Sequence, residues 1–238
     1  MQNNKTSSFI LGSALIASMF VLGYILGASI VKFKTLERSV SVKGLSEREV
    51  MADTVLWPIV HMEVENELPL LYAKLEKNRE MIVNFLKEKG FEEAEMSISA
   101  PSIIDKVAQE YGEANKVTYR YNATQTITLY SNKVDKTRSV MNEITSLGKR
   151  GVAFKNDSYS NATEYIFTKL NEIKPSMIEE ATQNARSAAL KFAEDSQSEL
   201  GKIKSANQGQ FSIIPRDRYT PHIKNVRVVS TVEYYLND

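Results

Sequence analysis

One long apolar segment stands apart from the rest of the hydrophobic pattern. Phe9 to Val31 holds 23 residues and no charged side chain. As a helix this segment would be roughly 34 Å long, which is enough to cross a bilayer core of about 30 Å. Three basic residues follow it closely, Lys32, Lys34 and Arg38. The pattern predicts a membrane-spanning helix at 9–31, preceded by a short tail at 1–8.

A cleaved signal peptide is the alternative interpretation of this segment. Signal peptides have a shorter apolar stretch and small residues before the cleavage site. The best site here follows Ala28 and places Leu26 three positions back, so we expect an uncleaved anchor. The orientation stays open. Basic residues that flank a transmembrane helix tend to stay on the cytoplasmic side, and there are three after the span against Lys5 before it, which favours a cytoplasmic domain. This tendency is weaker for long translocated domains.

Gly23 and Gly27 form a pair of small residues, four apart, inside the span. Such pairs let two transmembrane helices approach closely, which would make this a helix-dimer face. The alternative is that glycine is simply frequent in transmembrane helices.

After the span, the apolar residues follow strand and helix periods in turn. Glu47 to Asp53 predicts a polar turn, Pro58 predicts an edge position or a bulge, and Tyr119 and Tyr121 fall on the apolar side of a strand. Helical spacing predicts helices at 67–89, 134–147 and 175–199. Pro175 is expected to begin the last helix and Gly201 to end it. Strands are predicted at 35–44, 54–65, 96–104, 116–130, 152–159, 162–170, 202–214 and 224–236.

The order of these elements indicates the fold class. Strands and helices are interleaved, but the strands alternate apolar and polar residues, which is typical of sheets with one solvent-facing side. This favours an α+β domain at 32–238, with mixed or mostly antiparallel sheets and about three helices, over a doubly wound parallel sheet.

Composition narrows the chemistry of this domain. Beyond residue 31 the 29 basic and 29 acidic residues balance, which argues against a broad nucleic-acid surface. The chain has no cysteine, so disulfides and thiolate metal sites are excluded. Two histidines, His61 and His222, leave little for a histidine-rich metal centre, and both are interpreted as structural or exposed. We therefore expect no metal, no cofactor and no nucleic-acid partner.

No motif for catalysis is present in the sequence. There is no G-x-S-x-G and no phosphate-binding loop. Glu92, Glu93 and Glu95 are interpreted as a solvated face, and Tyr119-Arg120-Tyr121 as packing residues rather than a base-stacking strand. No catalytic residue is assigned.

The run from Val42 to Trp57, VKGLSEREVMADTVLW, resembles the opening signature of SIMPL-domain proteins. Gly44, Glu47 and Asp53 match its positions, while Ala52 replaces the usual proline. The alanine-rich segment 180–192, the Leu200-Gly201 pair, and the segments 205–213 and 226–236 also resemble that family. We expect structural roles for the signature positions Gly44, Glu47, Asp53, Trp57 and Gly201.

The resemblance implies a place in the periplasm or cell envelope, a link to oxidative-stress defence and ring-like self-assembly. The family has no established catalytic residues, so none are carried over. The first hypothesis is a non-enzymatic protein, anchored in the inner membrane with its large domain in the periplasm, that forms homo-oligomers. A peptide-binding, client-binding or chaperone-like module is the alternative, in which the strand near Pro58 or the final strand accepts a partner strand. An enzyme with an unrecognised site is the third.

Overall fold

The computed structural model describes residues 3–35, 38–108, 118–155 and 161–237. It begins with a long helix, α1 (Asn3–Thr35), and continues into an α+β fold, which confirms the predicted class. The residues divide into two compact units. The first comprises residues 1–47, 173–212 and 227–238, and the second comprises residues 48–172 and 213–226.

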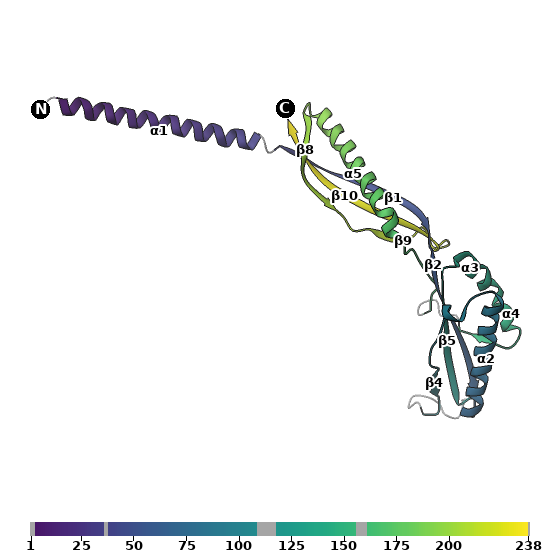
Figure 1. Ribbon diagram of the computed structural model, residues 1–238. Coiled ribbons are helices and arrows are strands. Elements are labelled where there is room, and N and C mark those ends of the chain that lie inside the picture. The colour runs from purple at the N-terminus through teal and green to yellow at the C-terminus, as the bar shows by residue number, and fades with distance from the viewer. Residues whose placement is uncertain (1–2, 36–37, 109–117, 156–160, 238) are drawn as a thin grey trace. The chain divides into compact units, whose positions relative to one another are not determined.

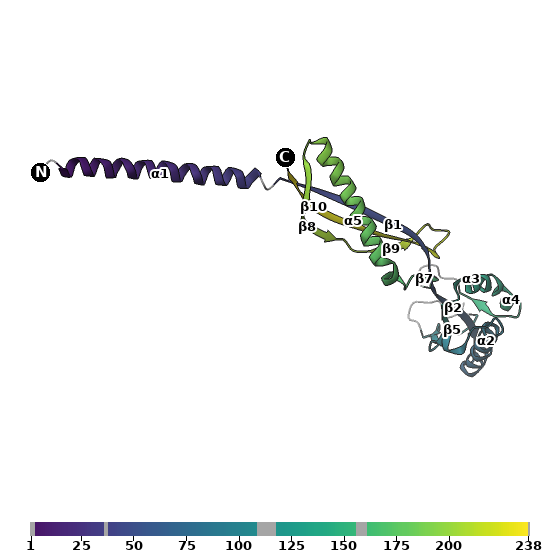
Figure 2. The same cartoon turned by 45° about the horizontal axis from the view of Figure 1, so that its top comes forward.

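The first unit places one helix on one face of a sheet (Figures 1 and 2). The sheet has the order β1-β10-β8, and β9 also pairs with β10; β8 and β10 are antiparallel. The helix is α5 (Leu170–Asp195), and its buried residues recur every four positions, so small side chains line the contact. The strands are β1 (Ser39–Met51), β8 (Glu199–Gln208), β9 (Ser212–Pro215) and β10 (Ile223–Asn237), and the buried helix residues are Met177, Ala181, Ala185, Ala189 and Ala193.

The second unit is built on a six-stranded sheet with the order β3-β5-β2-β6. β4 also pairs with β5, β7 also pairs with β2, and all these pairs are antiparallel. The strands are β2 (Thr54–Glu65), β3 (Met96–Ile98), β4 (Ser102–Asp105), β5 (Tyr121–Ser131), β6 (Ala153–Phe154) and β7 (Glu164–Ile166), and the helices are α2 (Leu68–Glu88), α3 (Val134–Glu143), α4 (Thr145–Gly148) and a 3-10 turn at Glu93–Glu95.

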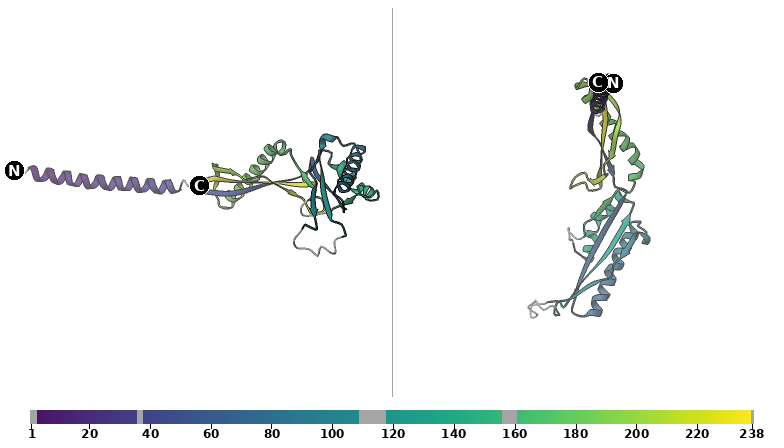
Figure 3. Two further views of the ribbon diagram at one scale, coloured as in Figure 1. Left: turned by 90° about the horizontal axis from the view of Figure 1, so that it is seen from below. Right: turned by 90° about the vertical axis from the view of Figure 1, so that its left-hand side faces the viewer.

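The main core of the second unit lies between its helices and the β2–β5 pair, which run side by side in Figure 3. Trp57 and Ile59 from β2 meet Ile127 and Leu129 from β5, and Ile82 comes from α2. The helical spacing of α2 therefore buries the stripe that the sequence predicts.

Three local predictions about backbone structure were wrong. β1 continues through the predicted polar turn to Met51, because its alternating residues keep a strand period. α5 begins at Leu170, so Pro175 lies inside the helix rather than at its start. Gly201 does not end that helix but lies in β8, where a Cβ would be 2.9 Å from the carbonyl oxygen of Tyr235. A close approach of two strands, rather than a helix end, explains this glycine.

Pro58 lies within an inner strand, not at the edge of the sheet. It pairs with Thr128 of β5 on one side. On the other side β7 pairs with residues 54–56 and β6 with 61–62, so Pro58 falls between these two short partners. This interval tolerates a residue that has no N–H to donate.

Tyr119 was also misplaced by the strand pattern. It precedes β5, which begins at Tyr121, and it is 43% exposed rather than part of a core face.

Candidate functional site

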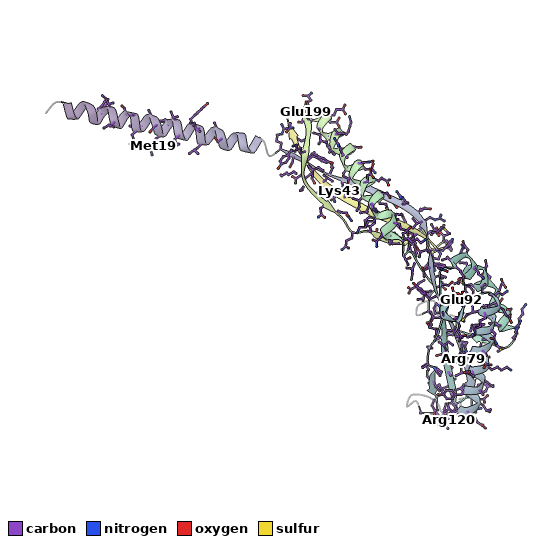
Figure 4. The ribbon with its side chains drawn as sticks, viewed as in Figure 1. Met19, Lys43, Arg79, Glu92, Arg120 and Glu199 are labelled. Atoms are coloured by element: carbon purple, nitrogen blue, oxygen red, sulfur yellow. The ribbon has the colours of Figure 1, made fainter. Side chains whose placement is uncertain are left out.

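The helix α1 carries the features of a membrane segment. Residues Phe9 to Ser29 are long and apolar enough to cross a membrane, and none of the side chains in that window is buried. A signal sequence shares these properties. Gly23 lies in a hollow formed with Met19, Phe20 and Tyr24 (Met19 is labelled in Figure 4). A Cβ at Gly23 or Gly27 would meet no atom within 4 Å, so this face of α1 is open to a second helix.

The signature glycine Gly44 allows β1 to lie directly against α5. A Cβ at this position would be 1.8 Å from the carbonyl oxygen of Ala181 and 2.4 Å from the nitrogen of Ala185. Polar contacts flank the approach: the Ser46 hydroxyl donates to Glu180 at 2.9 Å, and the Asn184 amide donates to a β1 carbonyl at 2.8 Å. Gly44 is therefore a packing position.

The signature aspartate Asp53 fastens the start of β2 to the segment that follows β7. Its carboxylate accepts hydrogen bonds at 2.9 Å from the Thr54 hydroxyl and from both the hydroxyl and the backbone N–H of Thr168. Burial alone raises the pKa of Asp53, but the hydrogen bonds from Thr168, Thr54 and Lys169 outweigh it and lower the pKa. Asp53, as a carboxylate, thus stabilises the contact between the start of β2 and the segment after β7.

The remaining signature positions have no shared site. Trp57 is 7% exposed and lies in the core of the second unit. Glu47 is exposed on β1, and Gly201 lies in β8 of the first unit. The structure therefore distributes the five signature residues over packing and anchoring roles and does not bring them together.

The strand β8 is an edge of the first unit's sheet. It pairs with β10 on one side, and each residue from Lys202 to Gln208 is exposed. Ile203, which is 52% exposed, pairs with Tyr234, whose side chain is buried with α5, so Ile203 lies on the helix side of the sheet. β1 is the other edge. Figure 4 labels Lys43 on β1 and Glu199 at the start of β8.

The flank of α5 nearest β8 adds a second exposed apolar residue. Glu180 and Asn184 contact β1, so this flank of α5 faces β1. The opposite flank, which carries Leu190, faces β8 because β8 lies beyond β10 in the strand order. Leu190 is 49% exposed. Ile203 and Leu190 are therefore two exposed apolar side chains on the β8 side of the unit.

These edges correct the expectation about strand addition. The strand near Pro58 is β2 and the final strand is β10, and both are paired on two sides. In the first unit's sheet the strands at the ends of the order, β1 and β8, are the ones that can accept a partner strand.

A separate cleft of about 570 Å³ opens in the second unit. Its walls come from three segments far apart in the sequence: α3, β7 and the loop between β9 and β10. The lining residues are Asp135, Arg138, Ser139, Met141, Asn142, Tyr165, Tyr219, Pro221 and His222. Their separation explains why no spacing motif pointed to the cleft.

The loop wall of this cleft is built around one carboxylate. Asp217 accepts hydrogen bonds from the backbone N–H groups of Tyr219 at 2.7 Å and Thr220 at 2.8 Å, from the Thr220 hydroxyl, and from Arg216 at 3.0 Å. The hydrogen bonds from Thr220 and Arg216 hold the pKa of Asp217 well below its usual range. The carbonyl oxygen of His222 accepts from Ala52 N–H at 2.8 Å. The loop is therefore held by its own hydrogen bonds.

Two rings form the floor of the cleft. The rings of Tyr165 and His222 lie 6.0 Å apart at 62°, an edge-to-face contact. The Tyr165 hydroxyl points to the sulfur of Met141, at 3.9 Å, and also lies beside the Arg138 side chain. Burial raises the pKa of Tyr165, although the charge and hydrogen bonding of Arg138 oppose this. Burial, followed by the charge of Arg138, lowers the pKa of His222, so its imidazole is neutral at pH 7.

Two other polar clusters are internally paired. Glu95 accepts from the Ser131 hydroxyl at 2.6 Å and from Lys133 at 2.8 Å. Arg120 donates to Asp105 and lies over the ring of Tyr121, 4.9 Å from its centroid. Within the described ranges, no three histidine, aspartate or glutamate side chains gather closely enough to hold a metal ion.

Comparison with known proteins identifies a family. The family model described as SIMPL, protein of unknown function (DUF541), matches residues 40–231, which is most of the chain beyond the apolar segment. No curated protein matches the chain.

Proposed function

This chain belongs to the SIMPL family, and we propose that it is a membrane-anchored, non-enzymatic protein that self-associates through the edges of its β1–β10–β8 sheet. The observation that carries the proposal is the ten-residue edge strand β8, exposed along Lys202 to Gln208, together with the exposed apolar side chains of Ile203 and Leu190.

The two edges can join different copies. If β8 of one copy pairs with β1 of the next, the sheet continues across the interface and its unpaired backbone groups gain partners. Such an interface uses two different surfaces, so repetition closes into a ring or extends into a filament. Lys202 and Lys204 on β8 limit indiscriminate pairing, as edge lysines do in many sheets.

The proposal further places the domain on the periplasmic side of the inner membrane, with a role in envelope or oxidative-stress defence. The apolar segment Phe9–Ser29 and the sequence resemblance support this. The chain contains no cysteine, so a single cysteine at the exposed Lys43 gives a clean test of topology. A membrane-impermeant maleimide should label Lys43→Cys in intact spheroplasts; labelling only after lysis would contradict the periplasmic location.

Light scattering tests self-association. We expect full-length protein in detergent and residues 32–238 in buffer to form an assembly of several chains, and Ile203→Lys to reduce its mass. Ile104→Lys is the matched control, because Ile104 is also an exposed isoleucine in a strand, 44% exposed in β4 of the other unit. Monomers in both preparations would contradict the proposal, as would equal effects of the two substitutions.

A second candidate function uses the same edge. An extended peptide from a damaged or unfolded client could add to β8, with backbone hydrogen bonds giving affinity and Ile203 giving contact to apolar side chains. In this case the purified protein would be monomeric, and unstructured apolar peptides would raise its melting temperature. Ile203→Lys would remove that shift and Ile104→Lys would not.

A further inference from the structure

We propose that the cleft between α3, β7 and the β9–β10 loop binds a small organic carboxylate with an aromatic or other apolar body, and that Arg138 holds the carboxylate. This site lies in the second unit and is independent of the proposed self-association through β8. Its volume of about 570 Å³ falls within the range of small-molecule sites.

The guanidinium of Arg138 supplies the charge. Its nearest acidic neighbour in the cleft is Asp135, with 3.7 Å between Nη1 and Oδ1, which is longer than an N–H···O hydrogen bond. Asp135 is 82% exposed, so water screens its attraction, while Arg138 is 41% exposed. A planar guanidinium has five donors and pairs with a carboxylate through two parallel hydrogen bonds.

His222 adds a second polar side chain to the cleft. It lines the cleft and is only 6% exposed, and a neutral imidazole has one N–H to donate. The Tyr165 hydroxyl lies in the same lining, beside both the sulfur of Met141 and the Arg138 side chain. A carboxylate oxygen of a ligand would accept hydrogen bonds from both groups.

The charges around the cleft favour a singly charged anion. Arg216 is the other nearby cation, but it is engaged by Asp217 at 3.0 Å and Glu49 at 3.4 Å. A single guanidinium at the cleft, beside the carboxylate of Asp135, suits a carboxylate ligand better than a phosphate dianion, which calls for several cations.

The rest of the cleft suits an apolar body. Met141 and Pro221 line it, and Tyr219 is 89% exposed at the rim although its backbone is fixed by Asp217. A ring stacked on Tyr219 would bury both partners. Because hydrogen bonds to Asp217 hold this loop, binding a ligand against it costs little conformational entropy.

Calorimetric titration of the full-length protein in detergent tests the proposal. The probe is N-acetyl-phenylalanine, with N-acetyl-phenylalanine amide lacking the charge and acetate lacking the ring. We expect saturable binding of the acid at or below roughly 1 mM and at least tenfold weaker binding of the amide and of acetate. The carboxylate could belong to the carboxy terminus of a peptide or to a free small acid, and a peptide ending in phenylalanine distinguishes the two. Tighter binding of the peptide than of N-acetyl-phenylalanine indicates a peptide end. Weaker binding of the peptide indicates a free acid.

Substitutions locate the site. Arg138→Gln should weaken binding at least tenfold, and Asp135→Asn should strengthen it several-fold because a competing negative charge is removed. Arg79→Gln is the matched control, since Arg79 (labelled in Figure 4) also pairs with an acidic residue three positions away, on α2 of the same unit. Absence of saturation, equal binding of acid and amide, or equal binding by the Arg138 and Arg79 variants would overturn the proposal. If Arg138→Gln does not fold, an unchanged affinity of Asp135→Asn would overturn it.

Discussion

Replacing Gly44 by alanine gives the sharpest test of the first unit. The new methyl carbon would lie 1.8 Å from the carbonyl oxygen of Ala181, while ordinary van der Waals contact begins near 3.4 Å. Both obstructing atoms belong to the α5 backbone, so no side-chain rotation relieves the clash. The helix and the strand must separate by about 1.6 Å at this point.

That separation opens the contact lined by Ala181, Ala185 and Ala189. A gap of 0.5–1 Å already loses roughly a quarter to a half of the dispersion attraction between packed atoms. Overpacked cores usually lose about 1–3 kcal/mol, and a clash against backbone belongs at the upper end. We expect a loss of about 3 kcal/mol, which for a chain of this size lowers the melting temperature by roughly 6–12 °C.

Thermal unfolding followed by circular dichroism measures the effect, and two other glycines calibrate it. Gly201→Ala meets Tyr235 at 2.9 Å and should cost less than Gly44→Ala. Gly148→Ala meets no atom within 4 Å and lies in helix α4, so it should be neutral or slightly stabilising. If Gly44→Ala melts within 2 °C of the wild type, the close approach of β1 and α5 is refuted.

Three further predictions concern the second unit and the anchor. Asp53→Asn should lower the free energy of unfolding by about 1.5–3 kcal/mol at pH 7, because the carboxylate accepts three hydrogen bonds at 2.9 Å. The pKa of Asp53 is lowered in the folded state, so this stabilisation is present at neutral pH and is lost as the pH falls through the folded pKa. The stabilities of wild type and variant should therefore converge in acid denaturation. His61 is fully buried and burial lowers its pKa, so on acidification the unfolded state takes up a proton near pH 6.5 before the folded state does. The free energy of unfolding should therefore fall as the pH decreases below about 6.5. His61→Phe should make the free energy of unfolding less dependent on pH in this range. Replacing Gly23 and Gly27 by leucine should lower the mass of full-length assemblies in detergent if α1 contributes to pairing, and an unchanged mass would assign assembly to the folded units alone.

The predictable part of the fold is the part that rests on local periodicity. The strand at 54–65 and the α2 stripe ending near Glu88 follow from side-chain spacing, which depends only on backbone geometry. The predicted strand at 96–104 is divided into β3 and β4, and the missing N–H of Pro101 between them explains the interruption.

Positions governed by long-range contacts were harder to predict. Gly201 has the sequence context of a helix end, yet its conformation is set by Tyr235, thirty-four residues later. Pro58 has the context of an edge, but the two short strands β6 and β7 leave an interval for it inside the sheet. A local pattern contains no information about such partners.

By itself, the sequence determined the apolar segment, the α+β class, the family signature and the absence of thiol chemistry, because each depends on composition or on the spacing of near neighbours. The tertiary structure decided that β8 and β1 are the sheet edges and that Arg138, Tyr165 and His222 meet in one cleft. These residues come from segments up to about eighty positions apart, and only the pairing of strands and the packing of helices brings their side chains together.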